Sequence, residues 1–119
     1  MKAIVEVGTT RSFFESSIAQ ISRSEAGEIP DFHLQFESAK TLFSELTAAR
    51  MDLLKVLKQT GACSVYALAK AAQRNYSNIH ADVTRLLELG LIARDDNGAV
   101  FMPFSEVDIR FGFDFKLAA

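Results

Sequence analysis

Apolar residues recur along residues 76–89 with the period of an α-helix. Ile79, Val83, Leu86 and Leu87 lie at successive offsets of four, three and one positions, which places them on one helix face. Gly90 follows the stretch, and an apolar pair comes directly after it. The pattern therefore predicts an amphipathic helix whose outer side is short, polar and basic: Ser77, Asn78, Ala81, Thr84 and Arg85.

The segment before this helix predicts three shorter helices, each preceded by a capping residue. Ser38, Thr47 and Ser64 carry side-chain oxygens that can accept backbone N–H groups at a helix N-terminus, and Gly61 can end the second helix. The inner faces are expected to hold Leu42, Phe43 and Leu46 in the first helix, Met51, Leu54 and Leu57 in the second, and Val65, Leu68, Ala69 and Ala72 in the third.

A short turn at residues 73–75 joins the third of these helices to the helix at 76–89. Two short helices joined in this way, the second with an exposed polar face, are typical of a helix-turn-helix. Strand-like runs at 91–94 and 99–102 then surround residues 95–98, which end in Asn97 and Gly98. Asn-Gly favours a hairpin turn. A hairpin in this position is a wing.

Alternating patterns predict strands near the N-terminus. Residues 2–7 place Lys2, Ile4 and Glu6 on one face and three apolar residues on the other, and residues 31–37 alternate with Phe32, Leu34 and Phe36 facing one way. Between them, residues 10–23 have a helical apolar stripe. A small βαβ or hairpin-like unit packed on one helix is expected.

The most regular strand pattern lies at residues 107–115. We expect this strand to complete a sheet with the two N-terminal strands and to pair with the same strand of a second chain, because so regular an edge would invite aggregation if left unpaired. The residues expected at this dimer or partner interface are Ile109, Phe111, Phe113 and Phe115.

The fold class expected is α+β. The predicted parts are an N-terminal β-α-β element at 1–37 for dimerisation or partner binding, a winged helix-turn-helix at 38–103, and a C-terminal strand at 104–119. Hydrophobic content of 49% is ample for a core. No apolar run approaches the roughly 20 residues of a membrane span, and Glu6 interrupts any signal-peptide pattern. We expect a cytoplasmic protein without membrane contact.

Charge is unevenly distributed along the chain. The net charge is −2, but residues 50–94 contain seven Lys and Arg against three Asp and Glu. The basic excess therefore coincides with the helix-turn-helix, where a DNA-facing surface would need it. One cysteine and two histidines argue against an intrachain disulfide and a structural zinc site. No catalytic constellation or phosphate loop stands out, so we expect no enzyme activity, cofactor or metal.

The run from Leu46 to Gly98 resembles prokaryotic winged helix-turn-helix transcriptional regulators of the multiple-antibiotic-resistance and arsenic-repressor type. The matching stretches are residues 46–54, 64–70, 76–83 and 85–92, of which Leu-Gly-Leu-Ile at 89–92 is the most specific. With residues 36–38 and the terminal strand, the chain also resembles short predicted regulators, some of which act as antitoxins beside a small toxin. The resemblance implies a homodimer that reads double-stranded DNA through the helix at 76–89. The wing tip departs from the pattern, since many such wings carry Arg or Lys where this chain has two Asp.

The DNA contacts expected in this setting come from four places: the end of the helix before the turn, the turn at 73–75, the outer face of the helix at 76–89, and the wing. The outer helix face would meet base edges, with Asn78 suited to adenine, Arg85 to guanine or phosphate, and Ala81 or Thr84 to a thymine methyl. The helix wheel places Tyr76 inward and His80 at the flank of the apolar face, partly buried. The complete predicted set is Lys70, Arg74, Asn75, Tyr76, Ser77, Asn78, Ala81, Thr84, Arg85, Arg94 and Asn97.

Two function classes remain open at this point. The first is a sequence-specific transcriptional regulator, with repression the expected sign. The second is an antitoxin that neutralises a small toxin through its acidic, Phe-rich ends and autoregulates its operon. A regulator that senses an effector would additionally need a cavity.

Overall fold

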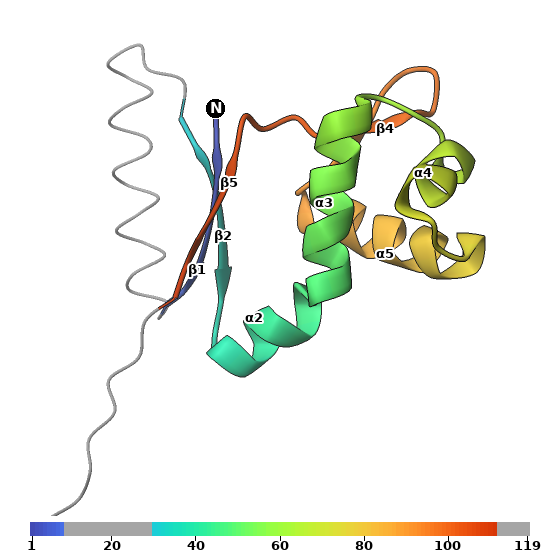
Figure 1. Cartoon of the computed structure of the whole chain (residues 1–119). Helices are drawn as coiled ribbons and strands as arrows, with labels where there is room; N and C mark the ends of the chain where they lie inside the picture. The colour runs from blue at the N-terminus through green and yellow to red at the C-terminus, as the bar shows by residue number, and fades with distance from the viewer. Residues whose placement is uncertain (9–29, 112–119) are drawn as a thin grey trace, which may run out of the picture. The chain divides into compact units, whose positions relative to one another are not determined.

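The computed structural model describes residues 1–8 and 30–111. The chain divides into two compact units, one made of residues 1–45 and 106–119 and the other of residues 46–105. The architecture is α+β, with a sheet in the first unit and helices with a small hairpin in the second (Figure 1). The helix expected at 10–23 and the interface residues Phe113 and Phe115 lie outside the described residues.

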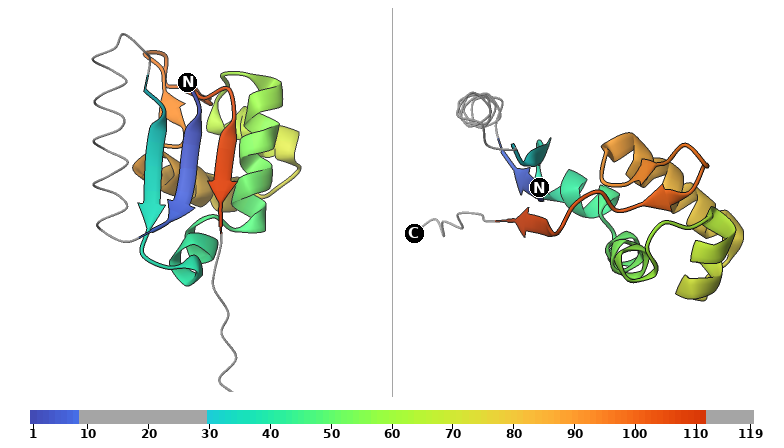
Figure 2. Two further views of the ribbon diagram at one scale, coloured as in Figure 1. Left: turned by 90° about the vertical axis from the view of Figure 1, so that its left-hand side faces the viewer. Right: turned by 90° about the horizontal axis from the view of Figure 1, so that it is seen from above.

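The first unit contains a three-stranded parallel sheet. Its strands are β1 (Ala3–Val7), β2 (Phe32–Phe36) and β5 (Val107–Arg110), in the order β2-β1-β5 (Figure 2). Both pairings are parallel, so the hairpin alternative for the N-terminal strands is wrong. In the register, Val5 lies opposite Leu34 on one side and Ile109 on the other. The C-terminal strand therefore joins the N-terminal pair, as the sequence pattern predicts.

The central strand is buried more completely than its alternation suggests. Ala3, Ile4 and Val5 are all buried, and Ile4 is only 3% exposed. The expectation that Ile4 shares a polar face with Lys2 and Glu6 is therefore only half right, because a central parallel strand is usually covered on both faces. Glu6 is partly buried and accepts from Gln35 Nε2 at 3.4 Å.

Helix α2 (Ala39–Glu45) follows β2. The predicted cap is confirmed, since Ser38 Oγ accepts from Thr41 N at 3.2 Å. Leu42 is buried, but the prediction that Phe43 is buried is wrong: it is 50% exposed. Its ring instead meets the edge of Phe111, with centroids 5.2 Å apart. A seven-residue helix buries a narrow stripe, and the position next to Leu42 is turned about 100° away from it.

The second unit is built on three helices. They are α3 (Ala48–Thr60), α4 (Val65–Ala72) and α5 (Tyr76–Leu89). The caps predicted at Thr47 and Ser64 are confirmed, and Gly61 ends α3 with a φ of 75°. The core of this unit consists of Leu46, Leu53, Leu54, Leu57, Leu68, Ala69, Ile79, Val83, Leu86, Leu91, Ile92, Val100 and Phe104.

A small sheet follows α5. Strands β3 (Ala93–Arg94) and β4 (Val100–Phe101) pair antiparallel and form the predicted wing. Cys63 adds an isolated bridge to Val100, with backbone bonds of 3.1 and 2.8 Å, which ties the loop before α4 to β4. The turn places Gly98 in the left-handed region at φ 82°, and Asp95 pairs with Ala99 across a three-residue loop. Cys63 is thereby fixed by backbone pairing.

The division into units places the boundary differently from the sequence pattern. Helix α2 belongs with the sheet, whereas the predicted boundary assigns residues 38–45 to the winged domain. Among residues 1–8 and 30–111, no helix combines the length and apolar character needed to cross a bilayer. The same residues hold no group of three or more His, Cys, Asp and Glu that could bind a metal ion.

Candidate nucleic-acid interface

The turn between α4 and α5 is fixed by its own hydrogen bonds. Gln73 adopts the left-handed conformation with φ 55°, and its N–H donates to Lys70 O at 3.1 Å. Arg74 N donates to Ala69 O at 3.1 Å. Asn75 then caps α5, because its Oδ1 accepts from Ser77 N at 2.8 Å and from Asn78 N at 3.4 Å. Asn75 is one of the predicted DNA contacts, but its side-chain oxygen already accepts these two hydrogen bonds within the helix-turn-helix.

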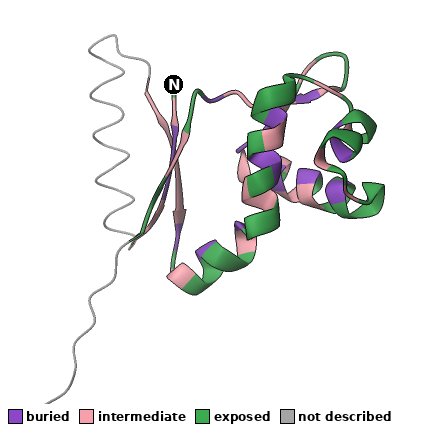
Figure 3. Ribbon diagram, viewed as in Figure 1, coloured by how far each residue is buried: buried purple, intermediate pink, exposed green. Residues whose placement is uncertain are grey.

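The predicted amphipathic character of α5 is confirmed. Ile79, Val83 and Leu86 are buried, while the opposite side faces solvent (Figure 3). The exposed side includes Ser77, Asn78, Ala81 and Thr84. Small side chains allow this face to approach another surface closely.

Hydrogen bonds within α5 restrict what the exposed face can offer. Thr84 Oγ1 donates to His80 O at 2.8 Å, so its hydroxyl hydrogen is already used. Arg85 Nη1 lies 2.8 Å from Glu88 Oε2, in an ion pair on one face of the helix. The Asn78 amide, in contrast, makes no side-chain hydrogen bond within the described part of the chain.

Two residues at the start of α5 lie differently from their predicted positions. Tyr76 is 49% exposed, so the expectation that it points inward is wrong. His80 is exposed as well and not partly buried. Their rings lie 5.9 Å apart, since residues at this spacing are neighbours on a helix surface. Both therefore belong to the solvent face.

An ion-pair cluster links α3, the turn and α5. Asp82 accepts from Arg50 Nε at 3.0 Å and from Arg74 Nη2 at 2.8 Å, and its side chain is only 13% exposed. Arg74 Nη1 is buried and lacks a hydrogen-bond partner among the described residues. Arg74 is one of the predicted DNA contacts, and the structure places one side of its guanidinium against Asp82. We call Asp82, Arg50 and Arg74 the Asp82 cluster.

A hollow lies beside the turn, between α4 and the start of α5. Its lining includes Tyr66, Lys70, Arg74 and Tyr76. Lys70 Nζ sits 4.8 Å from the centre of the Tyr66 ring, within the range of a cation–π contact. Tyr66 is 60% exposed. It is missing from the predicted contacts, although its position two residues before Leu68 already turns it outward from α4.

The wing tip uses its polar groups internally. Arg94 Nη1 donates to Gly98 O at 2.9 Å. Asp95 Oδ1 accepts from Asn97 N at 2.9 Å and from Ala99 N at 3.0 Å. One of the two acidic residues that make the wing unusual is therefore a turn-forming acceptor. Asp96 and the Asn97 side chain remain exposed.

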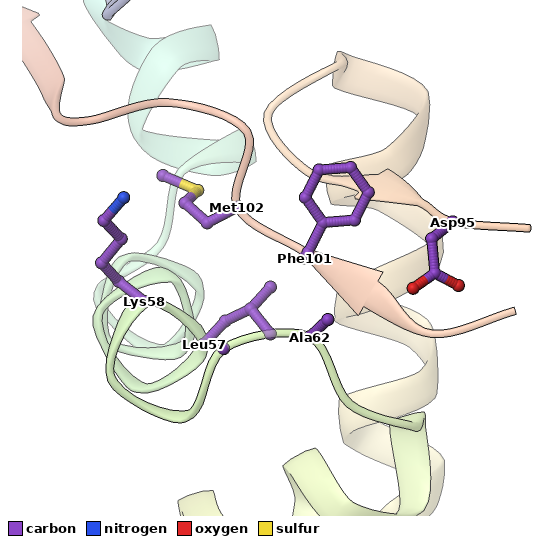
Figure 4. A pocket seen from close by; sticks show the side chains of 7 residues that line it. Leu57, Lys58, Ala62, Asp95, Phe101 and Met102 are labelled. Carbon is purple, nitrogen blue, oxygen red and sulfur yellow. The ribbon is translucent and has the colours of Figure 1, made fainter. Parts of the chain in front are cut away.

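A second hollow lies between the end of α3 and the base of the wing. Figure 4 shows Leu57, Ala62, Phe101 and Met102 around it, with a charged residue at either side. Lys58 Nζ donates to Phe104 O at 2.9 Å, and the carboxylate of Asp95 is held by the turn. Both charged groups already make hydrogen bonds within the domain, so we assign no ligand to this hollow.

These elements define a winged helix-turn-helix domain. Helices α4 and α5 are joined by a three-residue turn, α5 presents a small polar face, and a hairpin follows directly. The chain belongs to the family described as HVO_A0114, whose model matches residues 45–109.

Similarity to other known proteins is limited. No curated protein sequence matches this chain. The chain is similar to a crystal structure of the multiple antibiotic-resistance repressor (MarR) from Listeria monocytogenes, with 21% identity and a TM-score of 0.44. The alignment covers 77% of this chain and 60% of that one, so the chain spans less than two thirds of the length of that protein.

Proposed function

We propose that this chain is a sequence-specific DNA-binding transcriptional regulator that places α5 in the major groove. The observation that carries the proposal is the solvent face of α5, the second helix of the motif, on which Ser77, Asn78, Ala81 and Thr84 are small and exposed. Its most buried acid, Asp82, is paired with two arginines, so it does not present an isolated negative charge toward phosphate. A helix of this width fits the major groove of B-DNA.

Within this proposal, Asn78 is the principal base-reading residue. Its carboxamide can donate and accept at once, which matches the N6 and N7 edge of adenine. Ala81 lies one helical turn further along the same side and can contact a thymine methyl. Arg85 is already in an ion pair with Glu88, which neutralises part of its charge and restrains its guanidinium on the helix surface. We therefore rank Asn78 above Arg85 as a determinant of sequence.

The hollow beside the turn supports a phosphate contact. Lys70 contributes a cation there, and the exposed rings of Tyr66 and Tyr76 bring phenolic hydroxyls to the same surface. Hydroxyl and ammonium groups are common donors to the DNA backbone, which they position without reading sequence. Arg94 can add a contact from the wing while it keeps its bond to Gly98 O, because a guanidinium has five N–H donors.

Selection of preferred sequences from a random duplex library, followed by affinity measurements, tests the proposal. We expect Asn78→Ala to weaken binding to the selected sequence about 5- to 100-fold, the loss typical of one bidentate base contact, while binding to unrelated duplex changes little. Gln59→Ala is the matched control, since it removes a carboxamide from an exposed position on α3. Failure to select any sequence, or equal effects of the two substitutions, would contradict the proposal.

We further propose that the bound protein represses transcription, because a domain bound in the major groove excludes other proteins from the same DNA. A reporter placed behind the selected sequence should fall on expression of the chain and recover with Asn78→Ala. Among the described residues, a toxin-neutralising role would use exposed apolar groups such as Phe43 and Ile109, which fit other partners equally well. The proposal is therefore confined to regulation, and enzymatic activity forms no part of it.

A further inference from the structure

Strand β5 lies at one edge of the sheet and directs a set of backbone groups away from it. Ala3 N donates to Glu106 O at 3.0 Å, and Ala3 lies opposite Val107. In a parallel ladder with this register, the residues of β5 that bond to β1 are Asp108 and Arg110. The N–H and C=O groups of Val107 and Ile109 therefore point outward. Within the described part of the chain, they have no hydrogen-bond partner.

The side chains of β5 are arranged so that two copies of the strand, running antiparallel, would place opposite charges against each other. Asp108 and Arg110 flank Ile109 on either side and project from the opposite face of the strand. Arg110 Nη2 lies 3.1 Å from Asp108 Oδ2 along the same strand, and the Arg110 side chain remains 53% exposed. In both directions from Ile109, a charged residue comes first and an apolar residue second. The charge is negative on one side and positive on the other.

We propose that β5 pairs antiparallel with β5 of a second copy of this chain, about a two-fold axis that passes at Ile109. Ile109 would then face the partner's Ile109 in a hydrogen-bonded pair, using the outward backbone groups of both strands. Asp108 would face the partner's Arg110, and Arg110 the partner's Asp108. These are non-hydrogen-bonded pairs, in which opposing side chains approach most closely. The two three-stranded sheets become one continuous sheet.

The charges select this register over its neighbours. The outward backbone groups of β5 belong to odd-numbered residues, and these must lie opposite odd-numbered residues of the partner. A two-fold axis through any single residue satisfies this condition, so the alternative registers have their axes one residue to either side. An axis at Asp108 would place that carboxylate opposite the partner's Asp108, and an axis at Arg110 would oppose two guanidinium groups. Like charges directly opposite are destabilising, whereas opposite charges stabilise the pair. The axis at Ile109 gives two attractive pairs and no repulsive one.

Apolar surface supports the same partner. Ile109 is 36% exposed, and the neighbouring Phe43 and Phe111 rings are 50% and 42% exposed while in contact with each other. A two-fold axis at Ile109 brings both copies of this apolar row together on one face of the joined sheet, because side chains at alternate positions share a face. An exposed strand edge that is also apolar favours pairing with another strand.

Reversal of the charges gives the sharpest test, measured without DNA by sedimentation equilibrium. Asp108→Arg makes both flanking residues basic, and Arg110→Asp makes both acidic. Each variant alone would place like charges opposite one another, so we expect its dimer dissociation constant to rise at least about tenfold above that of the wild type, the size of two unfavourable cross-strand pairs. An equimolar mixture of the two should form a heterodimer, since every basic residue then faces an acidic one.

The heterodimer separates pairing from a local role of the Asp108–Arg110 ion pair, because both variants lose that pair and only the mixture regains opposite charges. Ile109→Pro is a second variant, since it removes an N–H that β1 does not use; it should abolish the dimer, while Ile109→Thr retains it. A wild-type chain that stays monomeric at about 100 μM, a concentration at which even a weak specific dimer is populated, would overturn the inference. So would variants that dimerise as the wild type does, or a mixture that remains unpaired.

Discussion

Replacing Asp82 with asparagine should destabilise the winged domain more than any other single charge removal on α5. Asp82 is the acceptor for two arginines that come from different parts of the unit, Arg50 on α3 and Arg74 in the turn. The asparagine side chain has nearly the same shape as aspartate but no charge. It could accept from one guanidinium, while its NH2 group would face the other. The substitution therefore leaves two cations close together without a shared counter-ion.

The size of the effect follows from the burial of the cluster. Hydrogen bonds to charged groups contribute about 1.5–3 kcal/mol each when buried, whereas exposed ion pairs contribute about 0.2–1 kcal/mol. Asp82 is 13% exposed, and Arg50 and Arg74 are 20% and 28% exposed, so the cluster lies between these limits. We expect Asp82→Asn to lower the free energy of unfolding by about 2 kcal/mol. For a chain of 119 residues, that corresponds to a fall in Tm of about 8 °C.

Urea unfolding followed by circular dichroism measures this loss directly. Glu88→Gln is the matched control, because it also neutralises an α5 acid that pairs with an arginine, but on the surface, where Glu88 is 56% exposed. We expect a change below about 0.5 kcal/mol for that control, the usual range for an exposed pair one helical turn apart. Equal losses for the two substitutions would show that burial does not set the strength of the Asp82 cluster and would refute the reasoning.

Two other predictions concern local backbone geometry. Asn75→Ala should cost about 1 kcal/mol in urea unfolding, because it removes the side-chain oxygen that caps α5; Asn75→Asp, which keeps an acceptor, should cost much less, and equal costs would argue against the cap. Gly98→Ala should cost about 1 kcal/mol, since φ 82° disfavours a side chain although an added Cβ would meet nothing within 4 Å. Gly98→Asn should recover part of that loss in thermal unfolding, and a neutral Gly98→Ala would show that the wing turn relaxes.

The local features of the second unit can be read from the sequence. Thr47 and Ser64 are followed by helices because an oxygen in the cap position satisfies N–H groups that have no partner within the helix. The 76–89 helix has its predicted bounds, since its apolar period is unbroken and Gly90 ends it in a left-handed conformation. Caps and periodicity depend only on neighbouring residues. That is why they are visible without a structure.

Features that depend on distant residues escape such local patterns. The pairing of Cys63 with Val100 joins segments that no local pattern connects. Ile4 is buried because β1 lies between two other strands, and alternation alone cannot say whether a strand is central. The wheel position of Tyr76 predicts an inward side chain, but as the first residue of α5 it lies beyond the buried stripe, which begins at Ile79.

The Asp82 cluster also changes what the basic excess of residues 50–94 means. Counted along the sequence, every arginine in this region adds to a surface suited to phosphate. In the structure, Asp82 pairs with Arg50 and Arg74, and Glu88 pairs with Arg85, so three of these cations have an acidic partner on α5 itself. Charge that is paired within the fold contributes less to the counter-ion release that drives non-specific binding. If the chain binds DNA as proposed, sequence-dependent contacts from the exposed face of α5 should therefore carry a larger share of the affinity than the charge count suggests.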